Sequence, residues 1–278
     1  MYENLFLIII ALIWIIGAVI QDLKKREVSN WWNFSLIAVA LSYRAFLSIL
    51  MHDYMYFIYG LIGFAVFFIL ANVFYYARIF AGGDAKLLMA LGAVLPFSFS
   101  FYGNLIIFAY FISLLLICGS VYGLIYSFIL VFRIWKDFKK EFLNQCEGNS
   151  KIIDVCFFTA FFLAIILLVF NQYLLGIIPL LLFLFPILYI YAKSVEEACL
   201  IKKIKIKDLT EGDWLYEEVD VGKVKGKKKI IEPNWEGLSA EELILLKKLK
   251  KGKVKIRQGI PFTPAFLFGF LVLIWLLI

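Results

Sequence analysis

Eight long, nearly uncharged apolar runs limit what this chain can fold into. About 20 such residues cross the hydrocarbon core of a bilayer as a helix. The apolar content is 63%, whereas soluble domains have roughly 45–50%. This excludes a soluble globular enzyme and a disordered chain, and we expect an all-α polytopic membrane protein. The expected spans are 5–20, 31–50, 54–77, 87–99 (with Asp84 as an alternative start), 105–132, 155–170, 174–191 and 260–278.

The basic residues test this assignment and give it an orientation. The chain has 28 Lys and Arg against 21 Asp and Glu, which is a net charge of +7. With eight spans, 27 of the 28 basic residues lie on one face, and the alternate connections 51–53, 100–104 and 171–173 hold none. Because Lys and Arg concentrate in cytoplasmic loops, we expect that face to be cytoplasmic and both termini to lie outside. Arg44 is the exception inside a span, and we expect it to snorkel toward the surface.

The polar stretches divide the chain into parts. We expect a membrane core, a basic cytoplasmic loop, an additional transmembrane hairpin, a small basic cytoplasmic α+β domain and a last transmembrane helix. In order, these parts are 1–132, 133–153, 154–191, 192–258 and 259–278.

Within the basic domain, Ser239 and Glu242 form the pattern of a capping box that opens an amphipathic helix through Leu249. Residues 208–221 and 223–231 are typical of short strands with glycine turns. The basic runs 202–207 and 223–229 predict contact with anionic lipid headgroups. Nucleic-acid binding is not expected, because the domain has neither a recognisable fold nor interleaved aromatic residues for it.

Two aspartates at the membrane boundary are the candidate catalytic residues. Asp22 directly follows the first span, and Asp84 opens the fourth; the topology places both at the cytoplasmic edge. Two carboxyl groups a few ångströms apart share a proton, so one can accept a proton from water while the other donates to a scissile carbonyl. Gly82 and Gly83 would let a substrate backbone approach closely. Taken singly, Asp22 could be a solvated interfacial residue and Asp84 a helix N-cap.

Other catalytic chemistries have little support. The chain contains one histidine and four cysteines, none in CxxC spacing. A zinc site, a haem site and a Cys-His or Ser-His-Asp triad are therefore disfavoured. We expect no cofactor and no metal.

Four short patches resemble the archaeal prepilin and preflagellin peptidases, which belong to the GxGD group of membrane aspartic proteases. The segment 22–30 (DLKKREVSN) is similar to that family's first-aspartate segment, and 82–86 (GGDAK) is similar to its second. The segment 258–266 (QGIPFTPAF) resembles the start of the last span, and 211–214 (EGDW) a patch in the preceding domain. Ala81 replaces the first motif glycine, Ser29 stands where proline is common, and the hairpin 154–191 is additional to the six spans of simpler members.

The resemblance implies that Asp22 and Asp84 are the catalytic pair. It also implies a precursor substrate with a class III-type leader peptide, a short basic leader removed from archaellin or type IV pilin-like proteins at the cytoplasmic edge of the membrane. Two other classes stay open from the residues alone. A transporter or channel would place charges near the midplane, and a nonenzymatic assembly scaffold would use the basic domain to bind lipid or an acidic partner.

Overall fold

The computed structural model describes residues 2–224, 227–248 and 252–277, and it divides into two compact units. The first comprises the chain up to Ile125 together with the segment from Pro261 onward; the second comprises Tyr126–Ile260. Within the described residues, six helices are long and apolar enough to cross a membrane, so the expected polytopic, mainly helical class is confirmed. In the described part of the second unit, five strands and a short helix form the small α+β domain.

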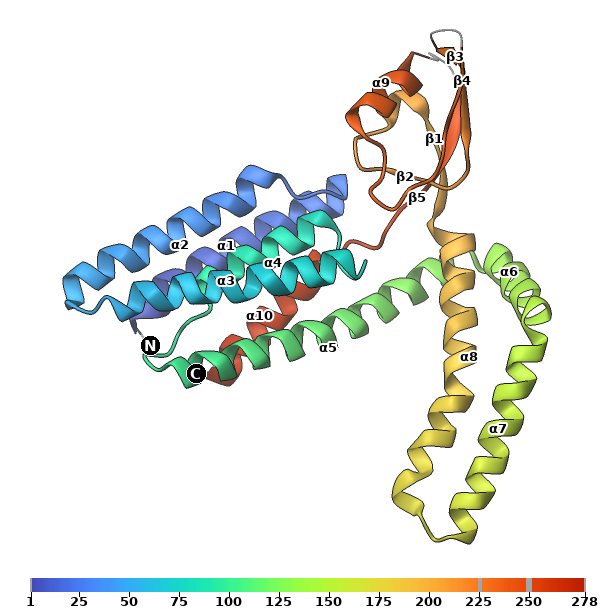
Figure 1. Ribbon diagram of the computed structural model, residues 1–278, viewed down its shortest axis with the longest axis horizontal. Helices are drawn as coiled ribbons and strands as arrows, with labels where there is room; N and C mark the ends of the chain where they lie inside the picture. The colour runs from blue at the N-terminus through green and yellow to red at the C-terminus, as the bar shows by residue number, and fades with distance from the viewer. Residues whose placement is uncertain (1, 225–226, 249–251, 278) are drawn as a thin grey trace. The chain divides into compact units, whose positions relative to one another are not determined.

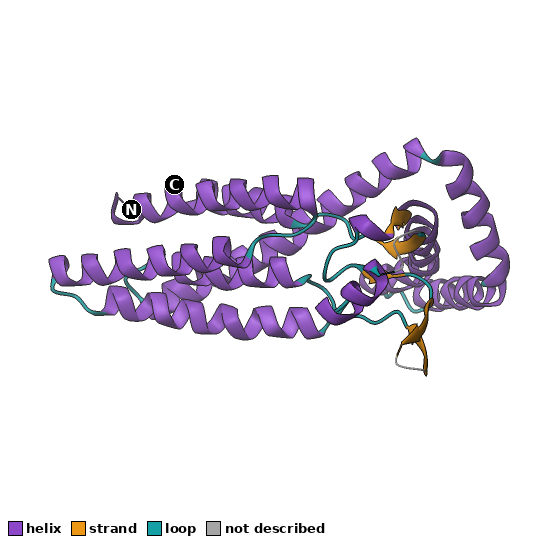
Figure 2. Ribbon diagram, turned by 90° about the horizontal axis from the view of Figure 1, so that it is seen from above, coloured by secondary structure: helices purple, strands orange, loops and turns teal. Residues whose placement is uncertain are grey.

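The first unit is a helical bundle (Figures 1 and 2). Its core consists of aliphatic and aromatic side chains from all of its helices, including Leu36, Phe67, Leu91, Phe111 and Phe270. The helices are α1 (Tyr2–Lys25), α2 (Asn30–Met51), α3 (Met55–Tyr76), α4 (Gly82–Val94), α5 (Phe101–Arg133, of which the first unit holds the part up to Ile125) and α10 (Thr263–Leu277).

Helix α4 lies against α3 at a backbone-to-backbone contact. A Cβ added to Gly63 would collide with the carbonyl oxygen of Gly92, and one added to Gly92 would collide with Phe67. Small residues let apolar helices approach in this way where no hydrophobic effect drives them together.

Helix α4 is also offset from the expected span 87–99, because it begins at Gly82. It ends at Val94 rather than continuing to Phe99, and its 13 residues span about 20 Å at 1.5 Å per residue. The hydrocarbon core is about 30 Å thick, so α4 alone does not cross it. Residues 95–100 continue without helix.

The second unit contains the additional hairpin and the polar domain. Helices α7 (Ser150–Val169) and α8 (Ile177–Val195) pack side by side, joined by a short 3-10 turn at Tyr173–Gly176 (Figure 1). The segment 133–153, expected as a loop, is largely helical: α6 covers Trp135–Gly148. Its helicity has a packing reason, because Phe138 lies in a small apolar cluster with Val195 and Cys199.

The polar domain is built on a three-stranded antiparallel sheet in the order β1-β5-β2. A separate hairpin pairs β3 with β4. The capping box is confirmed: Ser239 Oγ accepts from the backbone N–H of Glu242, and the Glu242 carboxylate accepts from that of Ser239. Leu249, the expected end of this helix, lies outside the described residues. The elements are β1 (Ile201–Lys205), β2 (Trp214–Leu215), β3 (Val219–Val224), β4 (Lys227–Ile231), α9 (Ala240–Lys247) and β5 (Lys253–Arg257), and a π-turn at Glu196–Leu200 joins α8 to β1.

Candidate active site

Asp22 lies in the last turn of α1, where the apolar run gives way to polar residues. Its side chain is 7% exposed, so it is not a solvated interfacial residue. Its Oδ2 accepts two hydrogen bonds from Thr263 at the start of α10, from the backbone N–H at 3.1 Å and from Oγ1 at 2.9 Å. The last helix therefore holds the first aspartate.

Asp84 lies in the first turn of α4 and is 8% exposed. It is not the N-cap, because that position is Ala81, which lacks a side-chain cap. The Asp84 carboxyl group lies close enough to Asp22 for the two to interact electrostatically. The fold thus brings together two buried carboxyl groups from α1 and α4, as the sequence predicted.

Helix α2 holds the segment that carries Asp84. Asn33 is fully buried, and its Nδ2 donates to the Gly83 carbonyl oxygen at 3.3 Å. Its Oδ1 is also buried and has no hydrogen-bond partner among the described residues. Nearby, Lys86 Nζ donates to Asn30 Oδ1 at 2.6 Å. The first contact holds the backbone just before Asp84, and the second joins the Lys86 side chain to α2.

The two glycines before Asp84 differ in how closely the chain approaches them. A Cβ added to Gly83 would lie 3.4 Å from the backbone nitrogen of Val28. At Gly82 the nearest atom would be Cε2 of Tyr75 at 3.8 Å, an ordinary contact. The chain's own packing therefore does not require glycine at position 82.

Arg44 does not snorkel; it is fully buried and caps the far end of α4. Its guanidinium donates to the carbonyl oxygens of Ala93 at 2.9 Å, and of Val94 and Pro96 at 2.8 Å each. It also lies 4.6 Å from the ring centroid of Tyr56. Carbonyls at a helix C-terminus lack intrahelical donors, so they offer the cation closer partners than the membrane surface does.

Sequence reasoning missed Thr263 and Asn33 as parts of this site. Thr263 stands within the patch that resembles the family's last span, but nothing in the spacing links it to Asp22, which lies 241 residues away. Asn33 is a polar residue inside an apolar run, a weak signal that can equally mark helix packing. Among the described residues, no three His, Cys, Asp or Glu side chains gather in a group that could hold a metal ion.

Fold and site together define a multi-pass helical membrane protein with a buried aspartate pair at helix ends. The sequence model of the Type IV leader peptidase family matches residues 9–168, more than half of the chain and both aspartates. The chain belongs to this peptidase family.

Three curated relatives are similar over part of the chain, and all are named preflagellin peptidase. The protein from Methanocaldococcus jannaschii is 39% identical over 88 residues, which are 32% of this chain and 37% of the relative. That from Methanococcus voltae is 32% identical over 97 residues, which are 34% of this chain and 41% of the relative. That from Methanococcus maripaludis is 30% identical over 132 residues, which are 45% of this chain and 57% of the relative. The chain thus aligns with between about a third and three fifths of their lengths, and no solved structure matches it.

Proposed function

We propose that this protein is a membrane aspartic endopeptidase that removes a short basic leader from archaellin or type IV pilin-like precursors. The observation that carries the proposal is the pair of buried, electrostatically interacting carboxyl groups of Asp22 and Asp84. Family membership and the names of the relatives support the same reaction class.

The proposed chemistry uses one ionised and one protonated aspartate. The carboxylate takes a proton from water as the water oxygen bonds to the scissile carbonyl carbon, and the carboxylic acid protonates the carbonyl oxygen. The resulting tetrahedral intermediate is not bonded to the enzyme. When it collapses, the C–N bond breaks, the leaving amine takes the proton that the first carboxylate had received, and one hydroxyl of the intermediate returns its proton to the second aspartate, which restores the starting pair. Gly82 and Gly83 would let the substrate backbone reach the pair.

We infer that the pair faces the cytoplasm and that both termini lie outside. Lys24, Lys25 and Arg26 follow Asp22, and Lys86 follows Asp84; the positive-inside rule makes a basic boundary cytoplasmic. A basic leader would also be held on that side of the membrane. Archaellin is the favoured precursor because the relatives are named preflagellin peptidase.

Co-expression with candidate precursors tests the reaction. Archaellin and pilin-like precursors are expressed separately with the wild-type chain, with Asp22→Asn and with Asp84→Asn, and trimming is scored by gel shift. We expect each substitution to abolish trimming, while Asp154→Asn, an exposed acid on α7, retains it. Trimming that survives both site variants would refute the aspartate pair.

Two further arms separate the alternatives. Activity that persists in EDTA and after cysteine- or serine-directed inhibitors supports the aspartic mechanism, and complete loss in chelator indicates a metalloprotease. Trimming of the pilin-like precursor alone would move the substrate assignment to that class. Absence of trimming by wild-type protein with any precursor would favour a transporter or a scaffold.

We also propose that anionic lipid headgroups bind the outer face of the polar domain's sheet. In the β1–β5 register, Lys203 pairs with Lys255, and Lys205 with Lys253. Val254 and Ile256 point into the domain core between these positions, so the lysines share the opposite face. Like charges directly opposite each other destabilise a sheet, so an anionic partner would relieve this repulsion.

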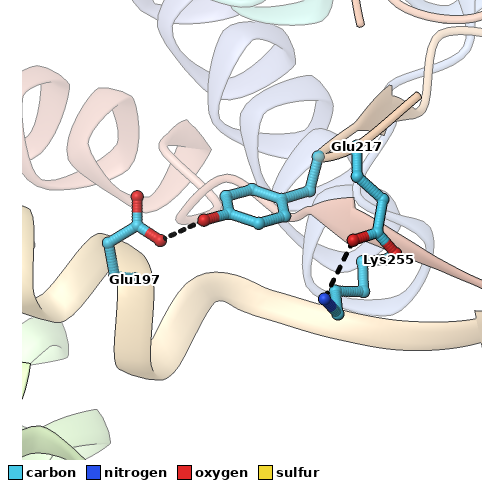
Figure 3. A network of polar contacts seen from close by, with 4 residues as sticks. Glu197, Glu217 and Lys255 are labelled. Atoms are coloured by element: carbon cyan, nitrogen blue, oxygen red, sulfur yellow. Dashed lines mark hydrogen bonds and ion pairs between the residues drawn. The ribbon is translucent and has the colours of Figure 1, made fainter.

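Among the described residues, the acidic side chains that pair with this face lie at one end of it. Lys255 pairs with Glu217 at 2.9 Å, and Arg257 pairs with Glu196 at 2.9 Å (Figure 3 shows the first). Within the described part of the chain, Lys203, Lys205 and Lys253 form no ion pair. Each basic residue near an anionic surface contributes about 1 kcal/mol.

Lipid selectivity in nanodiscs tests this partner. The full chain is reconstituted with spin-labelled phosphatidylglycerol or phosphatidylcholine, and the motionally restricted fraction of each label is measured. We expect Lys203, Lys205 and Lys253, changed together to Gln, to lower the preference for phosphatidylglycerol. The same charge change at Lys139, Lys140 and Lys247, which are exposed on α6 and α9 and not in the sheet, should leave most of this preference. Equal loss in both triple variants would show a diffuse charge effect and refute a site on this face.

A further inference from the structure

We propose that Thr263 is a positioning residue for the proposed reaction, and that it orients the Asp22 carboxyl group through its hydroxyl. The inference rests on the proposed function, because a positioning role requires that Asp22 takes part in the reaction. The contact itself is independent of that function, because both hydrogen bonds are properties of the fold.

Thr263 donates two hydrogen bonds to the same oxygen atom of Asp22. It is the first residue of α10, where backbone N–H groups have no intrahelical acceptor. Its backbone N–H and its Oγ1–H both donate to Oδ2 of Asp22. Thr263 is completely buried. Two donors on one oxygen restrict the rotation of the carboxyl group, and neither of these bonds uses Oδ1.

The start of α10 is itself held in place by aromatic packing. The ring of Phe262 lies 5.2 Å from that of Phe80 and 6.0 Å from that of Phe266, centroid to centroid. It also occupies the space beside Gly119 of α5, where an added Cβ would lie 2.5 Å from the ring. Thr263 therefore cannot shift without displacing this cluster.

This arrangement makes the site depend on a segment far from both aspartates. The part of the chain that matches the family, residues 9–168, contains Asp22 and Asp84 but not Thr263. Reaction rates respond steeply to the alignment of a catalytic group, so loss of one orienting hydrogen bond should slow the chemical step more than it weakens substrate binding.

Three variants at Thr263 test the proposal. Thr263→Val is nearly isosteric and removes only the hydroxyl bond; we expect kcat to fall about tenfold or more, as for loss of a hydrogen bond to a charged group, with KM nearly unchanged. Thr263→Ser keeps the hydroxyl and should stay within about threefold of wild type, whereas Thr263→Ala should resemble the valine variant. The matched control is Thr159→Val on α7, whose hydroxyl bonds only its own helix at Val155; it should leave kcat unchanged.

Each other pattern refutes the proposal. Unchanged kcat in Thr263→Val refutes positioning through the hydroxyl, and equal loss in the serine and valine variants shows that shape is what matters. A rise in KM with constant kcat would make Thr263 a substrate contact. Protein levels in the membrane and thermal midpoints identify variants that fail to fold.

A double-mutant cycle keeps this test separate from that of the proposed function. Thermal unfolding of Thr263→Val, Asp22→Ala and the double variant should give non-additive losses, because the two residues share a bond. If Thr263 and Asp22 are coupled in stability but the wild-type protein has no peptidase activity, the proposed function is refuted and the contact is supported. Additive losses would contradict the contact even in an active enzyme.

Discussion

Helices α4 and α7 are both apolar, yet the protein covers them to opposite degrees. Of the 13 residues of α4, nine are buried; of the 20 residues of α7, only Ala160 is. The apolar side chains of the two helices therefore lie in different surroundings: those of α4 contact other protein side chains, and those of α7 are mostly exposed. Helix α4 is enclosed by protein, which suits the segment that carries the proposed catalytic Asp84. Helix α7 presents its side chains to the outside of its unit, as expected for contact with lipid.

Their polar contacts differ in the same way. Helix α4 receives donors from another helix at both ends, from Asn33 at Gly83 and from Arg44 at Ala93 and Val94. The two contacts are separated by nearly the same number of residues, 11 on α2 (44 minus 33) and 10 or 11 on α4 (93 or 94 minus 83), so parallel helices can satisfy both. On α7, Thr159 bonds the carbonyl of Val155 in its own turn. Polar contacts between helices, more than hydropathy, therefore distinguish α4, whose position is held by its neighbour α2, from α7.

The largest expected effect comes from removing the buried cation. Arg44→Met leaves at least three carbonyl oxygens at the end of α4 without a donor, and each buried unsatisfied group costs about 1–3 kcal/mol. We expect a loss of roughly 3 kcal/mol or more in the free energy of unfolding, and Arg44→Lys should recover part of it. Thermal denaturation of the reconstituted protein measures the change.

Arg133→Met is the control for this change, because Arg133 is exposed on α5. It should alter the free energy of unfolding by less than about 0.5 kcal/mol, as surface substitutions usually do. Equal midpoints for Arg44→Met and Arg133→Met would contradict a capping role for Arg44.

The second effect is on catalysis rather than on folding. Asn33→Leu removes the donor to the Gly83 carbonyl, so the backbone that carries Asp84 is held less firmly. We expect kcat to fall about tenfold, equivalent to the 1–1.5 kcal/mol of a typical hydrogen bond. Precursor-cleavage kinetics measure it. Asn72→Leu, which removes a bond to Phe68 within the same helix, is the comparison, and similar kcat values for the two variants would separate Asn33 from the site.

The sequence alone predicts much of this comparison, but not all of it. Apolar runs and basic connections show where helices lie, because membrane thickness and loop charge act on each segment separately. Helix neighbours depend on side-chain packing between distant segments, which no local pattern records. That is why Asp22 and Asp84 were predictable as acids at matched depth, whereas the Thr263 contact was not. Arg44 was misjudged because its acceptors, the carbonyls of α4, become available only once α4 ends early.

A smaller effect should follow at Gly82, where the chain leaves room for a side chain. Gly82→Ala places a Cβ in ordinary contact with Tyr75, so stability should change by no more than a few tenths of a kcal/mol. If a substrate backbone passes over this position, the added methyl should raise KM or lower kcat by about threefold, which is under 1 kcal/mol. Gly148→Ala, at a site with open space around it, should leave both constants unchanged. Unaltered kinetics in Gly82→Ala would remove this glycine from the substrate path.

The smallest expected effect lies in the hairpin. Phe162 on α7 is 61% exposed, and lipid tails can fill the space that Phe162→Ala vacates, because they are as apolar as the side chain removed. We expect cleavage to be unchanged and stability to shift by about 0.5 kcal/mol or less. Phe111→Ala in the first unit removes a fully buried ring and should cost about 3–5 kcal/mol by the same denaturation measurement. A loss for Phe162→Ala approaching that of Phe111→Ala would mean that protein, not lipid, covers α7, and the contrast between the two helices would then rest on a missing partner.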